Sequence, residues 1–386
     1  MRMLYFSGVV PVQLNAGYTL MFRHLSRIRD HEVFIITRDF EKARNMEMPH
    51  PSIRLPERSR NYARITQRVG SPLFWLEREA VRLRRLALPH ALAFRPDLVL
   101  TVWGTPYLLA AADLAEELSL PVALVCHDDF EHMLPPHPRR RKWAASRLGQ
   151  ILHRARSRIC VGPGMLEHLA QLYGNVPMDI VHPIPGEPPV GGLPLRTRRP
   201  DEPLRIGFFG ELGGNYGPVN AVVDVLEEVD AEFHFFSHSV GPEREVLARQ
   251  PRVFDRGATD PRGLHEYFRA KIDVALIPQG FEAKHLSLRR ACFPSKLPEA
   301  CQTGLPLLVL APPEGSAARW AREYLDPLSL VEDLNRSALI PALLALKNRE
   351  FWKDQKERVS RIAEKVLSPV NIHAQFETAL GRALKP

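Results

Sequence analysis

The fold is decided by one stretch of sequence, Phe293-Pro-Ser-Lys-Leu-Pro-Glu-Ala-Cys-Gln-Thr-Gly-Leu-Pro-Leu-Leu-Val-Leu310. Its first part has helical character, and Gly304 and Pro306 are typical signals for the end of a helix. The apolar residues that close the stretch predict a buried strand, and Asp273–Pro278 predicts another strand upstream. A strand, a helix and a second strand in this order form the repeating unit of a parallel α/β sheet.

The same alternation extends over both halves of the chain. Near-continuous apolar strands between helices are typical of a doubly wound parallel sheet. The strands expected in the first half are Met3–Phe6, Glu32–Thr37, Asp97–Thr101, Val122–Cys126 and Ser157–Val161, and the helices are Ala16–Arg27, Ser71–Ala91, Tyr107–Leu118 and Met165–Leu172. The further strands expected in the second half are Leu204–Phe209, Glu232–Ser237, Val253–Phe254 and Leu307–Leu310, and the helices are Pro218–Glu228, Leu264–Ala270 and Ser295–Thr303.

A segment rich in proline and glycine separates the two halves. Pro183–Pro203 contains more of these residues than the interior of a helix or strand tolerates, so it predicts a linker. We therefore expect an α/β protein with two doubly wound, Rossmann-like domains, at residues 1–185 and 204–370, joined by residues 186–203. Ligands of open α/β sheets bind at the carboxyl ends of the strands, which places the expected cleft there.

Composition narrows the class of protein. The chain has 386 residues, of which 45% are hydrophobic and 25% charged, and this fits a two-domain globular protein rather than a disordered one. The four cysteines form no C-x-x-C pair, which argues against a zinc ribbon or a redox motif. No apolar run reaches the ~18–20 residues of a membrane span, and the first residues read as a strand. The expected location is cytoplasmic, or peripheral on the inner face of the membrane.

The formal net charge is +8, and basic residues crowd two segments of the first half, Arg54–Arg85 and Arg139–Arg158. Such clusters attract phosphates, so an anionic membrane surface is a candidate partner. A solvated surface in an Arg-rich chain explains the same pattern equally well. Nucleic acid is not expected as a partner, because no recognisable nucleic-acid-binding motif accompanies the charge.

A glycine-rich turn follows the strand Leu204–Phe209 and precedes a helix. Its backbone N–H groups and the helix N-terminus can hold a diphosphate, since glycines allow close approach. The turn residues Gly210, Glu211, Gly213 and Gly214 are therefore candidates for donor binding. Many α/β turns contain glycine for conformational reasons alone, and that interpretation stays open.

The helix of the opening stretch has a second set of candidates. Ser295 is placed as its N-cap, and Glu299 lies one turn in, on the face of Ser295 and Lys296. The carboxylate of Glu299 can accept hydrogen bonds from both hydroxyls of a ribose. A capped surface helix with an incidental glutamate is the competing interpretation.

The order of these motifs resembles the carboxyl-terminal domain of retaining GT-B glycosyltransferases of family 4, also called glycosyl transferases group 1. The resemblance implies that Glu299 holds the donor ribose and that the Gly210–Gly214 turn faces the diphosphate. Asn15-Ala16-Gly17 resembles the loop that places donor and acceptor, and the strand end at His127-Asp128 resembles the one that approaches the transferred sugar. Residues 371–386 resemble the last helix, which in this fold completes the first domain.

The chain also departs from the family pattern. Ala291 stands where the family often has a first glutamate, and Glu211 replaces an arginine expected in the turn. Asn215 and Tyr216 lie near the expected lysine. A leaving diphosphate needs positive charge, for which Lys296 is the first candidate; weaker candidates are Lys284, Arg289 and Arg290. No Asp-x-Asp signature is present, so no obligatory metal or other cofactor is expected.

His127 and Asp128 are the candidate catalytic residues. The resemblance implies that His127 forms hydrogen bonds to sugar or phosphate, with Asp128 orienting it; an ordinary hydrogen-bonded loop histidine is the alternative. A carboxylate nucleophile, at Asp128, Asp129 or Glu131, is not favoured, because the family proceeds without a well-placed protein nucleophile.

The expected function is transfer of a hexose-type sugar from a nucleotide-diphosphate sugar to a hydroxyl acceptor, with retention. The acceptor class stays open among glycans, lipid-linked molecules and small molecules. Two alternatives also stay open: a nucleotide-sugar epimerase of the same fold, and a catalytically degenerate glycosyltransferase-like binding protein. The missing basic residues and first glutamate motivate the second alternative.

Overall fold

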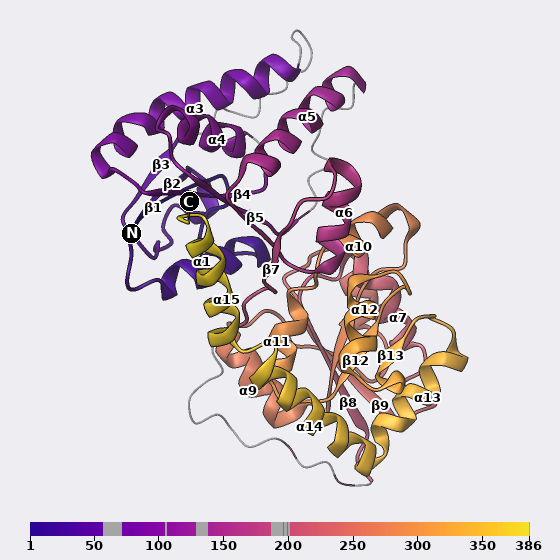
Figure 1. The fold of residues 1–386 in the computed structure, drawn as a ribbon. Helices are drawn as coiled ribbons and strands as arrows, with labels where there is room; N and C mark the ends of the chain where they lie inside the picture. The colour runs from indigo at the N-terminus through magenta and orange to yellow at the C-terminus, as the bar shows by residue number, and fades with distance from the viewer. Residues whose placement is uncertain are drawn as a thin grey trace. The chain divides into compact units, whose positions relative to one another are not determined.

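The structure is a computed structural model, and it describes residues 1–56, 72–104, 106–128, 138–186, 196, 199 and 201–385. The chain divides into two compact units (Figure 1). Unit 1 comprises Met1–His182 and His373–Pro386, and unit 2 comprises Pro183–Ile372. Part of the first basic segment, together with Asp129, Glu131 and most of the expected linker, lies outside the described residues.

Unit 1 contains a 7-stranded parallel sheet in the order β3-β2-β1-β4-β5-β6-β7. The strands are β1 (Arg2–Ser7), β2 (Glu32–Arg38), β3 (Ser52–Leu55), β4 (Leu98–Val102), β5 (Val122–Cys126), β6 (Ser157–Cys160) and β7 (Asp179–Ile180). The helices are α1 (Ala16–Arg27), α3 (Pro72–Phe94), α4 (Tyr107–Glu117), α5 (Pro138–Arg154), α6 (Pro163–Tyr173) and α15 (Pro369–Arg382).

Helices cover both faces of this first sheet. Helices α3, α4 and α5 contact one another on one side of it (Figure 1). Helix α1 packs against α15, where the buried His24 ring stacks on Phe376 with centroids 4.1 Å apart. His24 and His373 face each other with their Nδ1 atoms 3.3 Å apart. The last helix thus belongs to the packing of unit 1.

Unit 2 contains a 6-stranded parallel sheet in the order β10-β9-β8-β11-β12-β13. The strands are β8 (Leu204–Phe209), β9 (Ala231–Phe236), β10 (Val253–Asp255), β11 (Val274–Pro278), β12 (Leu307–Leu310) and β13 (Leu330–Val331). The helices are α7 (Tyr216–Val223), α8 (Pro242–Ala248), α9 (Pro261–Lys271), α10 (Leu286–Ala291), α11 (Lys296–Gln302), α12 (Ser316–Tyr324), α13 (Arg336–Lys347) and α14 (Arg349–Lys365). Aromatic residues fill much of its core, with Phe208, Phe233 and Phe235 fully buried.

The expectation of two doubly wound α/β sheets is confirmed, and most expected strands lie within a residue or two of their predicted bounds. Several segments differ from the prediction. Strands β3, β7 and β13 and helices α8, α12, α13 and α14 were not predicted, and α7 ends at Val223 rather than at Glu228. The second basic segment folds as the long helix α5, and the expected loop after β11 contains the short helix α10. In the part of the chain that the structure describes, no helix is both long and apolar enough to cross a bilayer.

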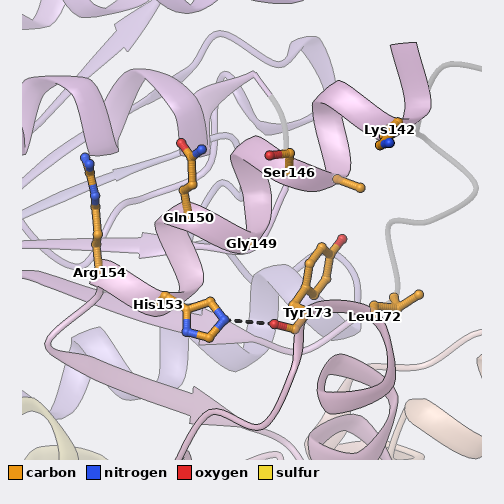
Figure 2. A pocket seen from close by; sticks show the side chains of 9 residues that line it. Lys142, Ser146, Gly149, Gln150, His153, Arg154, Leu172 and Tyr173 are labelled. Atoms are coloured by element: carbon orange, nitrogen blue, oxygen red, sulfur yellow. Dashed lines mark hydrogen bonds between the residues drawn. The ribbon is translucent and has the colours of Figure 1, made fainter. Parts of the chain in front are cut away.

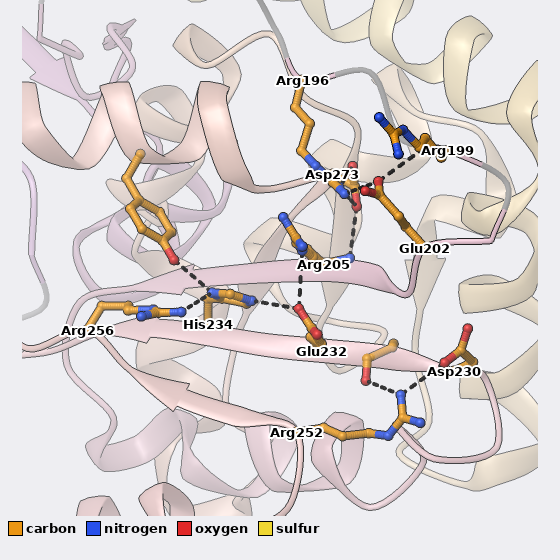
Figure 3. Close-up of polar contacts among 12 residues, drawn as sticks. Arg196, Arg199, Glu202, Arg205, Asp230, Glu232, His234, Arg252, Arg256 and Asp273 are labelled. Atoms are coloured by element: carbon orange, nitrogen blue, oxygen red, sulfur yellow. Dashed lines mark hydrogen bonds and ion pairs between the residues drawn. The ribbon is translucent and has the colours of Figure 1, made fainter.

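A network of ion pairs closes the amino-terminal edge of the second sheet (Figure 3). Asp273, which is fully buried just before β11, accepts hydrogen bonds from Arg196 at 2.7 Å and from the backbone N–H of Arg205 at 2.9 Å. The Arg205 guanidinium donates to Glu232 at 3.2 Å, and Glu232 lies 3.4 Å from His234. Each charge in this network has a partner of opposite sign, which is the condition for a stable buried charge.

Candidate functional site

The glycine-rich turn of unit 2 lies at the carboxyl end of β8. Gly210 has a φ of +108°, a conformation that side-chain-bearing residues rarely adopt. A Cβ at this position would overlap the Lys296 side chain, at 2.8 Å from its Nζ atom. Glycine at 210 therefore serves two purposes: it permits the turn, and it leaves room for a lysine that comes from another element.

Lys296, the first residue of α11, lies across this turn. Its ammonium donates to the Glu211 carbonyl at 3.4 Å and sits 4.6 Å from the centroid of the Phe208 ring. Burial, and secondarily the nearby charge of Arg289, lower the pKa of Lys296 to about 8, while Glu211 acts in the opposite direction. Lys296 is thus a partly buried cation at the end of a sheet.

Arg289, in α10, brings a second cation to the same turn. One terminal nitrogen of its guanidinium lies 2.6 Å from the position of a Cβ at Gly214. Burial lowers the pKa of this guanidinium. Helix α10 is held in place by the buried Gln279, whose amide donates to the Arg289 carbonyl at 3.0 Å and to the Ser316 hydroxyl at 3.2 Å.

The candidate cations differ in their partners. Lys284 pairs with Glu282 at 2.7 Å, and Arg290 pairs with Glu314 at 3.7 Å, both on the surface. Within the described ranges, Lys296 and Arg289 form no ion pair with any carboxylate. Of the three weaker candidates, Arg289 is therefore the one whose charge is available at the turn.

Glu299 lies one helical turn after Lys296 in α11. Its two carboxylate oxygens accept from the backbone N–H of Gly186 at 3.3 and 3.4 Å. It also lies near His265, whose lowered pKa is caused mainly by burial and is partly raised again by Glu299. Ser295 occupies the N-cap position of α11, as predicted, but its backbone is already helical and its side chain makes no capping hydrogen bond. The Ser295 hydroxyl is thus not used by the helix.

Unit 1 brings its own candidates together at the carboxyl ends of its strands. Asn15 caps α1, accepting from the Tyr18 N–H at 3.1 Å, so Ala16 and Gly17 open the helix. A Cβ at Gly17 would lie 2.5 Å from Nε2 of His127, which follows β5. Burial lowers the pKa of His127, and the adjacent Asp128 partly opposes this. A neutral imidazole therefore faces the start of α1.

These two groups of residues can do different chemistry. The turn with Lys296 and Arg289 offers positive charge and backbone N–H groups to an anion. The neutral His127 offers one donor and one acceptor to hydroxyl groups. No cluster of three or more metal-ligating side chains occurs among the residues described.

Sequence reasoning undervalued Arg289 and did not identify Gln279. No local sequence motif marks Arg289 or Gln279, because both act on the Gly210–Gly214 turn, which is far away in the sequence. Gln279 directly follows a buried strand, and polar residues at the carboxyl ends of parallel strands are the usual sources of site residues. That position was the one signal that could have identified it.

Residues 19–186 match the family model described as Glycosyltransferase Family 4. No curated protein matches the sequence. Among solved structures, a glycosyltransferase from Rickettsia africae is similar with a TM-score of 0.68 at 13% identity, over 100% of this chain and 98% of that one.

Two further solved structures are similar over nearly their whole length. HepE from Anabaena, solved in complex with UDP and glucose, has a TM-score of 0.65 at 13% identity, over 99% of each chain. The lipopolysaccharide outer core galactosyltransferase WaaB, in its apo form, has a TM-score of 0.63 at 13% identity, also over 99% of each chain. At such identities the likeness establishes the fold, which is GT-B.

Proposed function

Since the chain carries a glycosyltransferase family 4 domain within a GT-B fold, we propose that it moves a hexose-type sugar from a nucleotide-diphosphate sugar to a hydroxyl acceptor, with retention. The acceptor is a glycan, a lipid-linked molecule or a small molecule. The protein works in the cytoplasm or at the inner face of a membrane, and the basic residues of unit 1 favour an anionic surface there.

One observation carries this proposal. Lys296 and Arg289 converge on a glycine turn at the carboxyl end of β8, and in the described part of the chain neither forms a close ion pair, although Glu211 and Glu282 act on them electrostatically. The two adjacent cations repel each other, and a diphosphate would relieve that repulsion. The turn N–H groups at Gly213 and Gly214 would add hydrogen bonds to the same anion.

The other donor contacts follow from the position of α11. Glu299 would accept the ribose hydroxyls, exchanging its long bonds to the Gly186 backbone for shorter ones to the ligand. The Ser295 hydroxyl, which the helix does not use, is available near the same helix end. Charge develops on the diphosphate as the sugar leaves, and Lys296 and Arg289 would stabilise that charge.

In unit 1, the Asn15-Ala16-Gly17 loop and His127 would hold the acceptor and the transferred sugar. A His127 that is neutral at pH 7 forms hydrogen bonds without adding charge, and Asp128 would orient its ring. In this proposal no protein carboxylate acts as the nucleophile: Asp128, Asp129 and Glu131 are not assigned that role, and the reaction takes place directly between donor and acceptor.

The test is nucleotide binding measured by calorimetry with UDP, GDP, ADP and TDP, followed by the corresponding sugars. UDP is the first probe, because HepE was solved with it. Replacement of Glu299 by alanine is expected to weaken the best nucleotide by about 1.5–3 kcal/mol, the typical value of a hydrogen bond to a charged group. Glu245→Ala, at an exposed surface position, is the matched control.

Three outcomes would contradict the proposal. Unchanged affinity in Glu299→Ala removes the ribose assignment. A change of donor stereochemistry in the absence of any acceptor favours an epimerase, and no binding of any nucleotide diphosphate favours a degenerate binding protein. The anomeric configuration of the product, read by NMR, decides whether the reaction retains stereochemistry.

A further inference from the structure

A shallow hollow of about 570 Å³ lies on unit 1, between α5 and the end of α6 (Figure 2). It is lined by polar, basic and aromatic side chains, and no carboxylate is among its lining residues. None of the residues assigned above to donor or acceptor binding lines it. The hollow therefore has no role in the proposed transfer reaction.

One side of the hollow is a stripe along α5. Lys142, Ser146, Gln150 and Arg154 follow one another at intervals of four residues, which places them on one face of the helix. At about 1.5 Å per residue, the two end cations lie about 18 Å apart. All four side chains are exposed, and Arg154 has only a surface ion pair with Glu116, at 3.3 Å, which is weak enough to exchange for a ligand.

The other side of the hollow is aromatic. The Tyr173 ring lies against α5 at Gly149, where a Cβ would be 3.1 Å from the ring, which is closer than an ordinary van der Waals contact. Trp103 packs edge-on against Tyr173 with centroids 5.5 Å apart, and His153 donates to the Tyr173 carbonyl at 2.8 Å. Figure 2 shows the ring beside the helix, with Leu172 next to it. The ring is thus held in a fixed position.

From this arrangement we propose that the hollow binds an acidic oligosaccharide, such as a chain of uronic acids. The end cations fit carboxylates several sugar rings apart, and the Ser146 hydroxyl and the Gln150 amide between them fit sugar hydroxyls. The Tyr173 ring fits the apolar face of a pyranose. The neutral Ser146 and Gln150 between the two cations favour sugar hydroxyls over nucleic acid, whose phosphates repeat at every unit.

The experiment is calorimetric titration of the full chain with a hexamer of galacturonic acid, without any nucleotide sugar. Saturable binding is expected, and Lys142→Glu should weaken it by about tenfold, as expected for loss of a charge-assisted contact. Tyr173→Ala should weaken it as well. Arg85→Glu makes the same charge change at an exposed position of unit 1 outside the hollow and should leave the affinity unchanged.

Every other result overturns the proposal. Neutral maltohexaose that binds as tightly as the uronate hexamer removes the role of the cations. Equal losses in Lys142→Glu and Arg85→Glu show general electrostatic attraction, and tighter binding of hexathymidylate or of anionic vesicles assigns the hollow to another ligand. Circular dichroism establishes whether each variant is folded. If Tyr173→Ala does not fold, Lys142→Glu alone tests the proposal. Because no donor is present, failure here leaves the transfer reaction untouched.

Discussion

At the amino-terminal edge of the second sheet, the buried carboxylate of Asp273 is matched by Arg196 and by a backbone N–H group. At the carboxyl edge of the same sheet, the charge of Arg289 helps to lower the pKa of Lys296, and among the described residues neither cation forms a close ion pair with a carboxylate. A buried charge is stable only when opposite charge or hydrogen bonds compensate it. One edge contains that compensation, and the other would obtain it from a bound anion.

The difference separates residues that stabilise the fold from residues that perform its function. Charges at the first edge should affect stability when changed and leave nucleotide affinity alone. Charges at the second edge should affect nucleotide affinity and cost little or no stability. Substitutions at the two edges test this distinction.

The largest expected effect is on stability. Asp273→Ala leaves Arg196 without its buried partner, and breaking such a pair costs about 3–5 kcal/mol of unfolding free energy. Chemical denaturation followed by tryptophan fluorescence measures it. Asp201→Ala, at an exposed position, is the control and should stay within about 0.5 kcal/mol of the parent. A loss below about 1 kcal/mol in Asp273→Ala would show that this edge is not held by its charges.

The next effect is on binding. Lys296→Met is expected to weaken the binding free energy of UDP by about 1.5–3 kcal/mol, because it removes a charged contact to the diphosphate. The free energy of unfolding should stay the same or rise, because a partly buried cation without a close ion pair is replaced by an apolar side chain of similar length. Arg289→Met should act in the same direction, and Lys284→Met, which affects a surface pair, should not. Calorimetry and denaturation on the same samples give both quantities. A variant that loses stability but keeps UDP would reverse the assignment.

A smaller effect follows from the pKa of Lys296, which lies near 8. Below that pH the side chain is a cation, and above it the charge is lost. At pH 9 about a tenth of it remains charged, so the specificity constant kcat/KM should fall about tenfold between pH 7 and 9. Lys296→Arg, which stays charged at these pH values, should remove most of this fall. A profile that is identical in both proteins would assign the titration to another group.

The smallest effect extends the comparison to unit 1, where His24 and His373 are kept neutral by burial. The pKa of His24 is far below its ordinary value, mainly through burial and secondarily through its electrostatic interactions with His373 and Arg27. The unfolded chain binds the proton more readily, so stability should fall as the pH falls below about 6.5, on the order of 1 kcal/mol by pH 5.5. His24→Gln should show a shallower decline on acidification. Parallel curves for the two proteins would mean that the pair does not control acid stability.

Much of the architecture could be predicted from periodicity alone. The runs that became β5 and β12 are apolar throughout, and β8 is apolar apart from Arg205. Helix α5 was not predicted, because its many arginines dilute the apolar pattern, although Leu148, Ile151 and Leu152 are spaced for one buried face. The six-residue helix α10 is too short to show any period.

The candidate site was only partly predictable, for a different reason. Gly210, Lys296 and Glu299 belong to local motifs, and local order places them at the ends of strands. The approach of Arg289 to Gly214 depends on how α10 packs around the buried Gln279, and this is a tertiary contact without a sequence pattern. A charge that is contributed by a distant element can be recognised only once the fold is known.

Helix α15 has a consequence for how the protein is made. Unit 2 is one continuous segment, whereas unit 1 is interrupted after His182 and resumes at His373. During synthesis the ribosome therefore polymerises the second unit before it makes the helix that stacks on His24. At about 5–20 residues per second, the first unit waits for tens of seconds with one face of α1 uncovered. Unit 1 is therefore the first unit whose synthesis begins and the last whose packing is completed.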